Sequence, residues 1–144
     1  MKRQIQQSAK NKVLEYLASR DHSEKELREK LSRKFEKAEV DEAIEAARVS
    51  NLLLDPAELA KRVATQLARK KKSHTYIQKF LHKKGLPAVA RETDSEIEKA
   101  RELVLTKFKK TGPFSYEEKP KVHRYLMYRG FDQDTIRRVI HEGK

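Results

Sequence analysis

The residues best suited to bind a ligand are cations that share one stretch of the chain. Between Leu59 and Arg91 there is no Asp and no Glu, while Lys and Arg occur ten times. Like charges repel one another on a helix surface unless an anion binds there, and a phosphate backbone is the commonest such anion. A lysine-rich helix face that is simply solvated is the alternative. The stretch therefore predicts an anion-binding surface in the middle of the chain.

Two clusters of Lys and Arg are the candidate binding residues. The first cluster ends one expected helix and continues along the next, where it is expected to meet phosphates of single-stranded DNA or an acidic protein surface. The second cluster lies nearer the carboxyl terminus. Together the candidates are Arg69, Lys70, Lys71, Lys72, Lys79, Lys83, Lys84, Lys107, Lys109, Lys110, Lys121, Arg124 and Arg129.

Aromatic residues are interleaved with the second cluster, namely Phe114, Tyr116, Tyr125 and Tyr128. Aromatic side chains stack on unpaired bases in many proteins that bind single strands. Packing in the core is the favoured alternative, because Tyr125 and Tyr128 are three residues apart on the helix of Leu126. At least one of these two rings is expected to point inward, and base stacking stays open as the second interpretation.

The sequence contains no pattern typical of catalysis or cofactor binding. Its five histidines include no HExxH motif and no pair at i, i+4 spacing, and the absence of cysteine excludes thiolate nucleophiles and thiolate metal sites. Four glycines are too few for a glycine-rich phosphate loop. We expect a protein that is not an enzyme, with no catalytic residue, no metal site and no cofactor.

Composition predicts an all-α protein. Charged residues make up 39% of the chain, and Gly and Pro number four each, which disfavours long sheets with many turns. No aliphatic run is longer than the three residues of Leu52–Leu54, so neither a signal peptide nor a membrane-spanning helix is expected. The lack of cysteine fits a reducing compartment, and we expect a cytoplasmic protein.

Capping residues and hydrophobic periodicity place the helices. Ser23 and Glu26 form a capping box, Thr93 and Glu96 form another capping signature, and Glu26 is expected to pair with Lys30 on the helix surface. The other expected caps are Asp55, Ser73 and Asp132. The expected helices span about 8–20, 23–35, 40–50, 56–71, 73–85, 93–111, 120–129 and 132 onward, with a short segment of uncertain structure over 88–92.

Three helices share one apolar pattern, which indicates an internal repeat. Ile77 and Leu81 of the middle helix match apolar pairs 50 residues earlier and 45 residues later. Short helices of this kind bury their apolar faces by stacking on neighbouring repeats. We expect an all-α fold of three tandem three-helix repeats forming an elongated, curved solenoid-like array, divided into residues 1–55, 56–93 and 94–144.

Three segments of the chain resemble the RecX family of bacterial regulators of the RecA recombinase. They are Arg20–Leu31, Lys83–Gly85 and Lys121–Phe131, which follow the family's order and spacing within a match that runs from about residue 12 to 141. The chain departs from the family pattern at Phe35, which lacks a preceding glycine, and between Pro87 and Asp94, where the third helix of the middle repeat looks truncated.

The resemblance implies a fold of three tandem three-helix repeats and a non-enzymatic function. Members bind the RecA nucleoprotein filament in its helical groove and restrain its ATPase, strand-exchange and coprotease activities. The expected partners are therefore the RecA filament and its single-stranded DNA, in recombination, DNA repair and the SOS response, and the chain is expected to act as a monomer. The alternative is a general DNA-binding module built of helix-turn-helix-like repeats.

Overall fold

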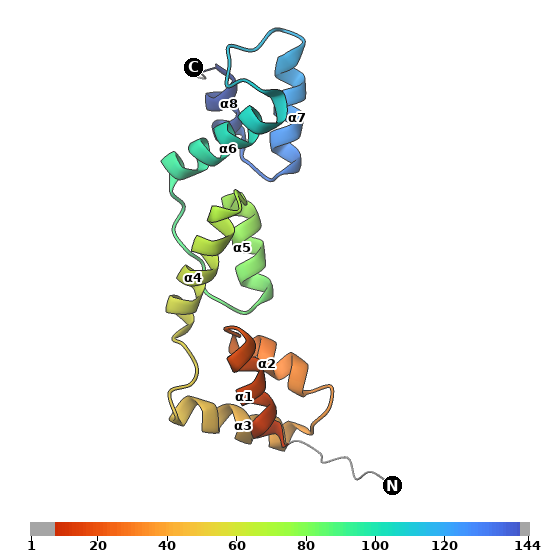
Figure 1. Ribbon diagram of the computed structural model, residues 1–144, viewed down its shortest axis with the longest axis vertical. Coiled ribbons are helices and arrows are strands. Elements are labelled where there is room, and N and C mark those ends of the chain that lie inside the picture. Colours follow the sequence, from red (N-terminus) through yellow and green to blue (C-terminus); the bar gives the residue numbers. More distant parts are fainter. Residues whose placement is uncertain (1–7, 142–144) are drawn as a thin grey trace. The chain divides into compact units, whose positions relative to one another are not determined.

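The structure, a computed structural model, describes residues 8–141, and these residues form α-helices without a strand (Figure 1). The predicted all-α repeat fold is confirmed. Residues 1–7 and 142–144, which the predicted first and third repeats include, lie outside this part. No helix within 8–141 is long and apolar enough to cross a membrane. The helices are α1 (Ala9–Ser19), α2 (Glu24–Leu31), α3 (Lys37–Val49), α4 (Pro56–Arg69), α5 (His74–Lys83), α6 (Thr93–Phe108), α7 (Glu118–Tyr128) and α8 (Gln133–His141).

The middle repeat contributes two helices instead of three. After α5, residues 84–92 contain no helix, which agrees with the truncation expected before Asp94. Pro87 lacks an amide donor and disfavours the helical conformation of the residue before it, and only seven residues separate Gly85 from α6. This connection is too short to hold a third helix and its two loops.

Contacts group the described residues into two units. The first unit contains the chain up to Ala60 together with His82–Pro87, and the second contains Lys61–Leu81 together with the chain from Ala88 onward. The predicted boundaries near residues 55 and 93 stay a prediction about how the repeats divide the sequence.

Each unit has its own apolar core. In the first unit, α1, α2 and α3 bury Val13, Leu27 and Ile44 almost completely. The core of the second unit comes from α6, α7 and α8, and includes Val122 and Ile136. Complete burial of such an aliphatic side chain stabilises the folded state by about 1.5–3 kcal/mol. The apolar periodicity of the sequence therefore marks the inward faces of these helices.

Four predicted helix caps are confirmed. The side chains of Ser23, Asp55, Ser73 and Asp132 each accept a hydrogen bond from a backbone amide two or three residues later. The predicted capping pair of Thr93 and Glu96 is wrong. The N-cap residue of α6 is Glu92, whose side chain makes no capping hydrogen bond, and Glu96 accepts a hydrogen bond from the amide of His74 instead. Helix α3 begins at Lys37, earlier than expected, and α4 ends at Arg69.

In the first unit, the start of α2 contacts the end of α5. The Ser23 hydroxyl, besides capping α2, donates a 2.5 Å hydrogen bond to the carbonyl of Lys84. Gly85 follows with a φ of 71°, and a Cβ at this position would lie 2.9 Å from the Cβ of Lys25. Glycine is required here for both reasons, since other residues rarely adopt this φ and their side chains would clash.

Glu26 places a buried carboxylate at the same contact. It accepts hydrogen bonds from Arg20 Nη2 at 2.7 Å and from Lys84 Nζ at 3.2 Å, and its other oxygen accepts from the amide of Ser23 at 3.2 Å. The expected pair with Lys30 is wrong, because the Lys30 ammonium lies 2.8 Å from His22 Nε2 instead. Burial alone would raise the pKa of Glu26, but these donors outweigh it and lower the pKa to about 2.

The second unit repeats this arrangement with different residues. Ser73 caps α5, and it lies against Gly130, which ends α7 with a φ of 86°. A Cβ at Gly130 would lie 2.8 Å from the Ser73 Oγ, closer than real Cβ contacts. In both units a capping serine thus lies at the contact with a glycine-containing helix end, where it contacts the residue before Gly85 in the first unit and Gly130 itself in the second.

A buried ion pair accompanies the second contact. Glu96 and Lys99 are 3% and 8% exposed, and their oxygen and nitrogen lie 2.6 Å apart. Glu96 also accepts from the amide of His74 at 3.0 Å, and Lys99 donates to the carbonyl of Lys72 at 2.9 Å. The pair therefore satisfies two backbone groups between the end of α4 and the start of α5.

Replacement of Glu26 by Gln should reduce the loss of stability in acid. A carboxylate whose folded-state pKa lies below its unfolded value stabilises fully above the unfolded pKa, near 4.5, and this contribution is lost as pH falls toward about 2. Between pH 5 and 2 the free energy of unfolding of the Gln variant should fall less than that of the wild type, by on the order of 2–3 kcal/mol. Urea unfolding at several pH values measures this difference. Glu29→Gln, on the exposed side of α2, is the matched control, and an equal effect there would contradict a special role of Glu26.

Replacement of Gly130 by Ala should destabilise the second unit by about 1–3 kcal/mol, through backbone strain and the clash with Ser73. Thermal unfolding measures the effect. The double variant Ser73→Gly/Gly130→Ala removes the hydroxyl that the new Cβ would meet, so the two substitutions should be non-additive. Strict additivity would show that the two residues are not coupled.

Candidate nucleic-acid interface

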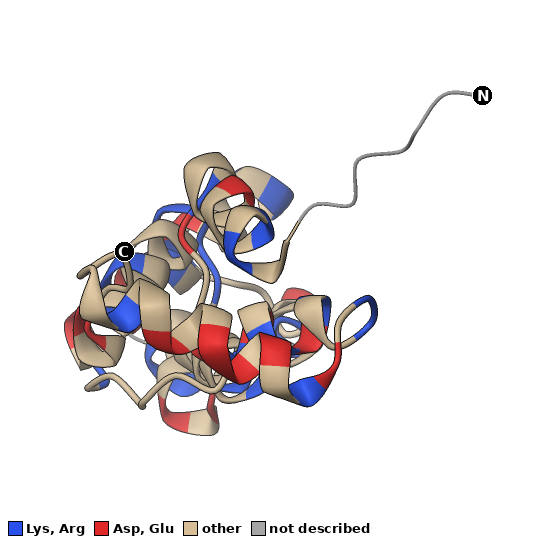
Figure 2. Cartoon of the chain, turned by 90° about the horizontal axis from the view of Figure 1, so that it is seen from below, with Lys and Arg blue, Asp and Glu red and all other residues tan. Residues whose placement is uncertain are grey.

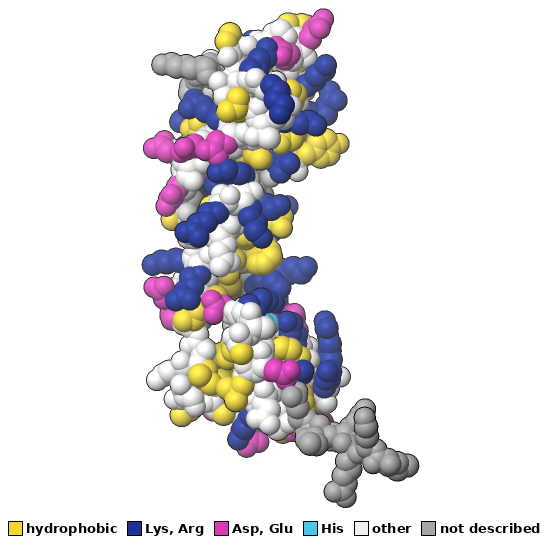
Figure 3. Space-filling model, viewed as in Figure 1, with side chains coloured by type: hydrophobic (Ala, Val, Ile, Leu, Met, Phe, Trp, Pro, Cys, Tyr) yellow, Lys and Arg dark blue, Asp and Glu magenta, His cyan; other side chains and the backbone are white. Residues whose placement is uncertain are grey.

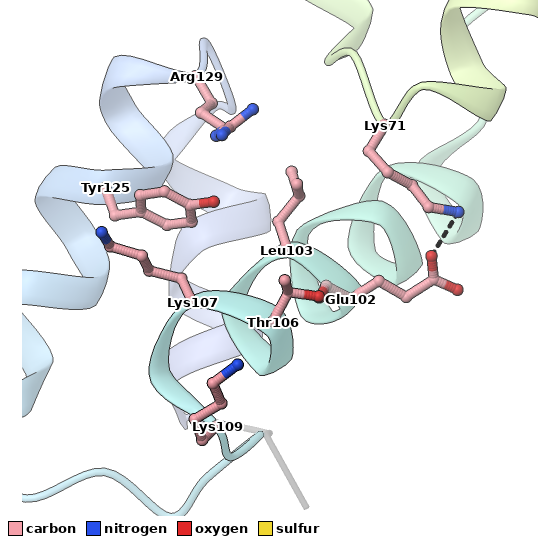
Figure 4. A pocket seen from close by; sticks show the side chains of 8 residues that line it. All are labelled: Lys71, Glu102, Leu103, Thr106, Lys107, Lys109, Tyr125 and Arg129. Atoms are coloured by element: carbon pink, nitrogen blue, oxygen red, sulfur yellow. Dashed lines mark hydrogen bonds and ion pairs between the residues drawn. The ribbon is translucent and has the colours of Figure 1, made fainter.

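A groove of about 490 Å³ in the second unit brings together four of the predicted cations (Figure 4). Lys71 lies just after α4, two lysines come from the end of α6, and Arg129 follows α7. Its lining residues are Lys71, Glu102, Leu103, Thr106, Lys107, Lys109, Tyr125 and Arg129. Folding therefore joins one lysine of the first predicted cluster with three cations of the second.

The groove carries more positive than negative charge. Lys71 Nζ forms a 2.5 Å ion pair with Glu102, and the Arg129 guanidinium lies 5.1 Å from the centre of the Tyr125 ring. In Figure 4, the side chain of Tyr125 extends from α7 toward α6, and that of Lys107 extends from α6 toward α7. Within residues 8–141 no carboxylate pairs with Lys107, Lys109 or Arg129, so three cations are left to attract an anion.

Two lysines of the groove have a backbone conformation that favours glycine. The φ of Lys71 is 62° and that of Lys109 is 65°, both in the left-handed region. This conformation costs a residue with a Cβ about 1–2 kcal/mol. A cation is favoured near a helix C-terminus by roughly 0.3–1 kcal/mol, which offsets only part of the cost. Lysine at two such positions on one groove therefore suggests that the side chain itself is needed.

The remaining exposed candidates also have no acidic partner. Among the described residues, no ion pair is formed by Arg69, Lys70, Lys79, Lys121 or Arg124 of the second unit, or by Lys83 of the first. In Figure 3, Lys and Arg side chains dominate the surface over α4 and α5, whereas Figure 2 shows acidic and basic residues interspersed along the helices nearest the viewer. The charge segregation of the sequence is therefore also present on the surface.

Three candidates are occupied by contacts within their own unit. Lys84 pairs with Glu26 in the first unit. In the second unit, Lys110 lies 2.6 Å from Glu118, whose pKa it lowers to about 2, and Lys72 lies 4.8 Å from the centre of the Tyr76 ring. Like Lys71, which pairs with Glu102, these cations are less suited to bind phosphate than Lys107 and Lys109, because a ligand would have to displace an existing partner.

The aromatic residues divide between core and surface. Phe114 is buried in the core, and Tyr125 packs edge-on against Phe108 with a centroid distance of 5.7 Å. The expected inward-pointing ring is thus Tyr125. Tyr116 and Tyr128 are 91% and 86% exposed, so their side chains have no role in the core.

Sequence reasoning missed the residues that complete the groove and the contacts around it. Glu102, Leu103 and Thr106 lie on the side of α6 that carries Lys107 and Lys109, a relation that helical spacing could have indicated. Arg91 belongs to the basic stretch, but it pairs with Asp132 and hydrogen bonds to Thr135 at 3.0 Å. Within 8–141 no group of three or more His, Asp or Glu is arranged to hold a metal ion.

Comparisons with protein families match two parts of the chain. Residues 9–45 match the model of "RecX, first three-helix domain", and residues 94–140 match that of "RecX, third three-helix domain". The first segment contains α1, α2 and most of α3, and the second contains α6 to α8 except the first residue of α6 and the last residue of α8.

Relatives and solved structures with the same name cover most of the chain. The "Regulatory protein RecX" of Clostridioides difficile is 32% identical, over 93% of this chain and 67% of that protein. The "Regulatory protein RecX" of Prosthecochloris aestuarii is 33% identical, over 93% of this chain and 92% of that protein. The crystal structure of RecX from Lactobacillus salivarius is similar in fold, with a TM-score of 0.75 and 22% identity over 93% of both chains.

Replacement of Lys109 by Gly should separate binding from stability. Relief of the left-handed strain should leave the free energy of unfolding unchanged or raise it by up to about 1 kcal/mol, while the removal of a groove cation should weaken single-stranded DNA binding about three- to tenfold at low salt. Thermal unfolding and fluorescence anisotropy measure the two effects.

Asn51→Gly is the matched control, since Asn51 has a φ of 55° and carries no charge. It should give the same relief of strain in the first unit with unchanged DNA affinity. Wild-type affinity in the Lys109→Gly variant would show that this lysine does not contact DNA.

Proposed function

This chain belongs to the RecX family of regulatory proteins, and on that premise we propose that it binds the RecA filament on single-stranded DNA and inhibits it. The inhibited activities are ATP hydrolysis, strand exchange and coprotease activity, so the protein modulates recombination and DNA repair. The observation that carries the proposal is the groove of the second unit, where Lys107, Lys109 and Arg129 have no acidic partner among the residues of 8–141.

The cations supply the attraction to the filament. Each phosphate that Lys or Arg neutralises releases condensed counterions from the strand, which favours binding most strongly at low salt. An acidic surface of the recombinase would be attracted by the same field. Arg69, Lys70 and Lys79 extend the positive surface beyond the groove, and Lys121 and Arg124 do so on α7.

Inhibition follows from occupancy, without bond-making or bond-breaking. A regulatory protein seated in the filament groove occupies space that the second DNA strand and protein substrates of the coprotease need. No residue of this chain has to act as an acid, base or nucleophile in such a mechanism. We propose that the protein works in this way as a cytoplasmic monomer, without a cofactor or a membrane contact.

The second candidate function is a general DNA-binding module that needs no protein partner. The unpaired cations favour it as much as they favour the filament, because phosphates are the same on naked DNA. Preference for the filament over naked single-stranded DNA distinguishes the two functions, as does the effect on RecA itself.

Replacement of Lys107 by Glu should reduce both binding and inhibition. Reversal of one groove charge should make the slope of log affinity against log salt shallower by about 0.7 for each phosphate that the protein no longer neutralises. Roughly tenfold more protein should then be needed to inhibit RecA ATPase. Filament binding, naked-DNA binding and ATPase are measured in parallel at several salt concentrations.

Lys37→Glu is the control, since Lys37 is an exposed lysine of α3 with no ion pair among the described residues. It should behave like the wild type. A wild-type protein that leaves RecA ATPase and strand exchange unchanged at stoichiometric ratios would overturn the proposed function, even if it binds DNA.

A further inference from the structure

The exposed side of α7 carries a tyrosine beside two unpaired cations. Lys121, Arg124 and Tyr128 follow one another at i, i+3 and i+7, so they share one side of the helix. All three are exposed, Tyr128 to 86%, and no ion pair or ring contact occupies them within the described residues. A helix face with this content has no structural role inside the second unit.

Tyr128 differs from the other tyrosines in what lies over its ring. Cations cover Tyr16, Tyr76 and Tyr125, at distances of 5.0, 4.8 and 5.1 Å from nitrogen or guanidinium carbon to ring centre. Tyr116 is equally open, but it lies in the loop before α7 and outside the side that carries Lys121 and Arg124. Tyr128 alone among the described tyrosines therefore combines an open ring with neighbouring cations on a helix.

We propose that Tyr128 stacks on a base of single-stranded DNA, with Lys121 and Arg124 binding the adjacent phosphates. Aromatic rings stack on any unpaired base, and nearby cations neutralise the strand that carries it. Along α7 the three side chains span about 10 Å, enough for a short run of nucleotides. In a duplex the faces of the bases are already stacked, so this site selects unpaired DNA.

The site continues the groove rather than competing with it. Tyr128 lies three residues from Tyr125, which lines the groove, and the two are neighbours on the helix surface. A strand with phosphates near Arg129 can therefore present its next base to Tyr128. This inference rests on the proposed function, because it names the form of DNA that the cationic surface recognises.

The open ring of Tyr128, rather than the charge of its neighbours, favours DNA over an acidic protein as the occupant. An acidic protein surface would pair with Lys121 and Arg124, but it has no base on which the ring of Tyr128 could stack. The distinction is testable, because an abasic strand keeps the phosphates and removes the bases. Removal of a stacked base costs roughly 1–3 kcal/mol.

The experiment compares binding of oligo-dT and of an abasic oligomer of equal length to the full chain. Tyr128→Ala should weaken binding of oligo-dT about 5- to 150-fold, the range that corresponds to removal of one stacked base, and should leave binding of the abasic strand unchanged. Tyr128→Phe should keep wild-type affinity, since it keeps the ring. Tyr116→Ala, the matched control for an exposed tyrosine, should bind both strands like the wild type.

Thermal unfolding of each variant excludes a change in the fold, because neither ring is buried. Equal weakening for both strands, or no weakening in Tyr128→Ala, would overturn the stacking proposal. The RecA ATPase assay separates this outcome from failure of the proposed function. If Tyr128→Ala binds oligo-dT like the wild type and still inhibits RecA, only the stacking proposal is contradicted. If the wild type itself does not inhibit RecA, only the proposed regulatory function is contradicted.

Discussion

The structure depends on a close contact between the start of one helix, capped by a serine, and the glycine-containing end of another. Ser23 reaches the backbone beside Gly85 in the first unit, and Ser73 meets Gly130 in the second. In both places the backbones approach so closely that a Cβ on the glycine would lie within 3 Å of a neighbouring atom. Each serine also caps its own helix, so one hydroxyl serves the helix start and the contact at once. Each contact thereby limits how closely the two helix ends can pack within its own unit.

Two acidic residues are buried at these contacts. Glu26 and Glu96 are buried beside the two serines, where each accepts hydrogen bonds from a cation and from a backbone amide. Burial would raise the pKa of Asp132, but Arg91 and the Thr135 amide lower it to about 2. Carboxylates committed to such contacts cannot neutralise cations elsewhere on the surface. The positive groove and the unpaired side of α7 follow from this division of charge.

Several cations of the candidate groove lie at helix ends, where the backbone is least regular. Lys71 and Lys109 follow α4 and α6 in the left-handed conformation, and their side chains line one groove. Glycine would relieve this strain but would remove the charges. Strain retained at a surface that gathers cations fits the general observation that such conformations cluster at functional sites. The candidate groove is thus built in part from positions that stability alone would not favour.

The sequence by itself determined the helices, most of their caps and the set of cations from which the surface is built. These features depend on neighbours within one helical turn, so Ser23, Asp55, Ser73 and Asp132 could be predicted as caps. Only the tertiary structure decided which partner each long side chain takes. Glu96 resembles a local capping residue but binds the amide of His74, and Lys84 belongs to a run of cations but pairs with Glu26. It also decided that Tyr125 packs inward while Tyr128 stays exposed, because burial depends on which helices lie opposite, a relation that spacing along one helix does not contain.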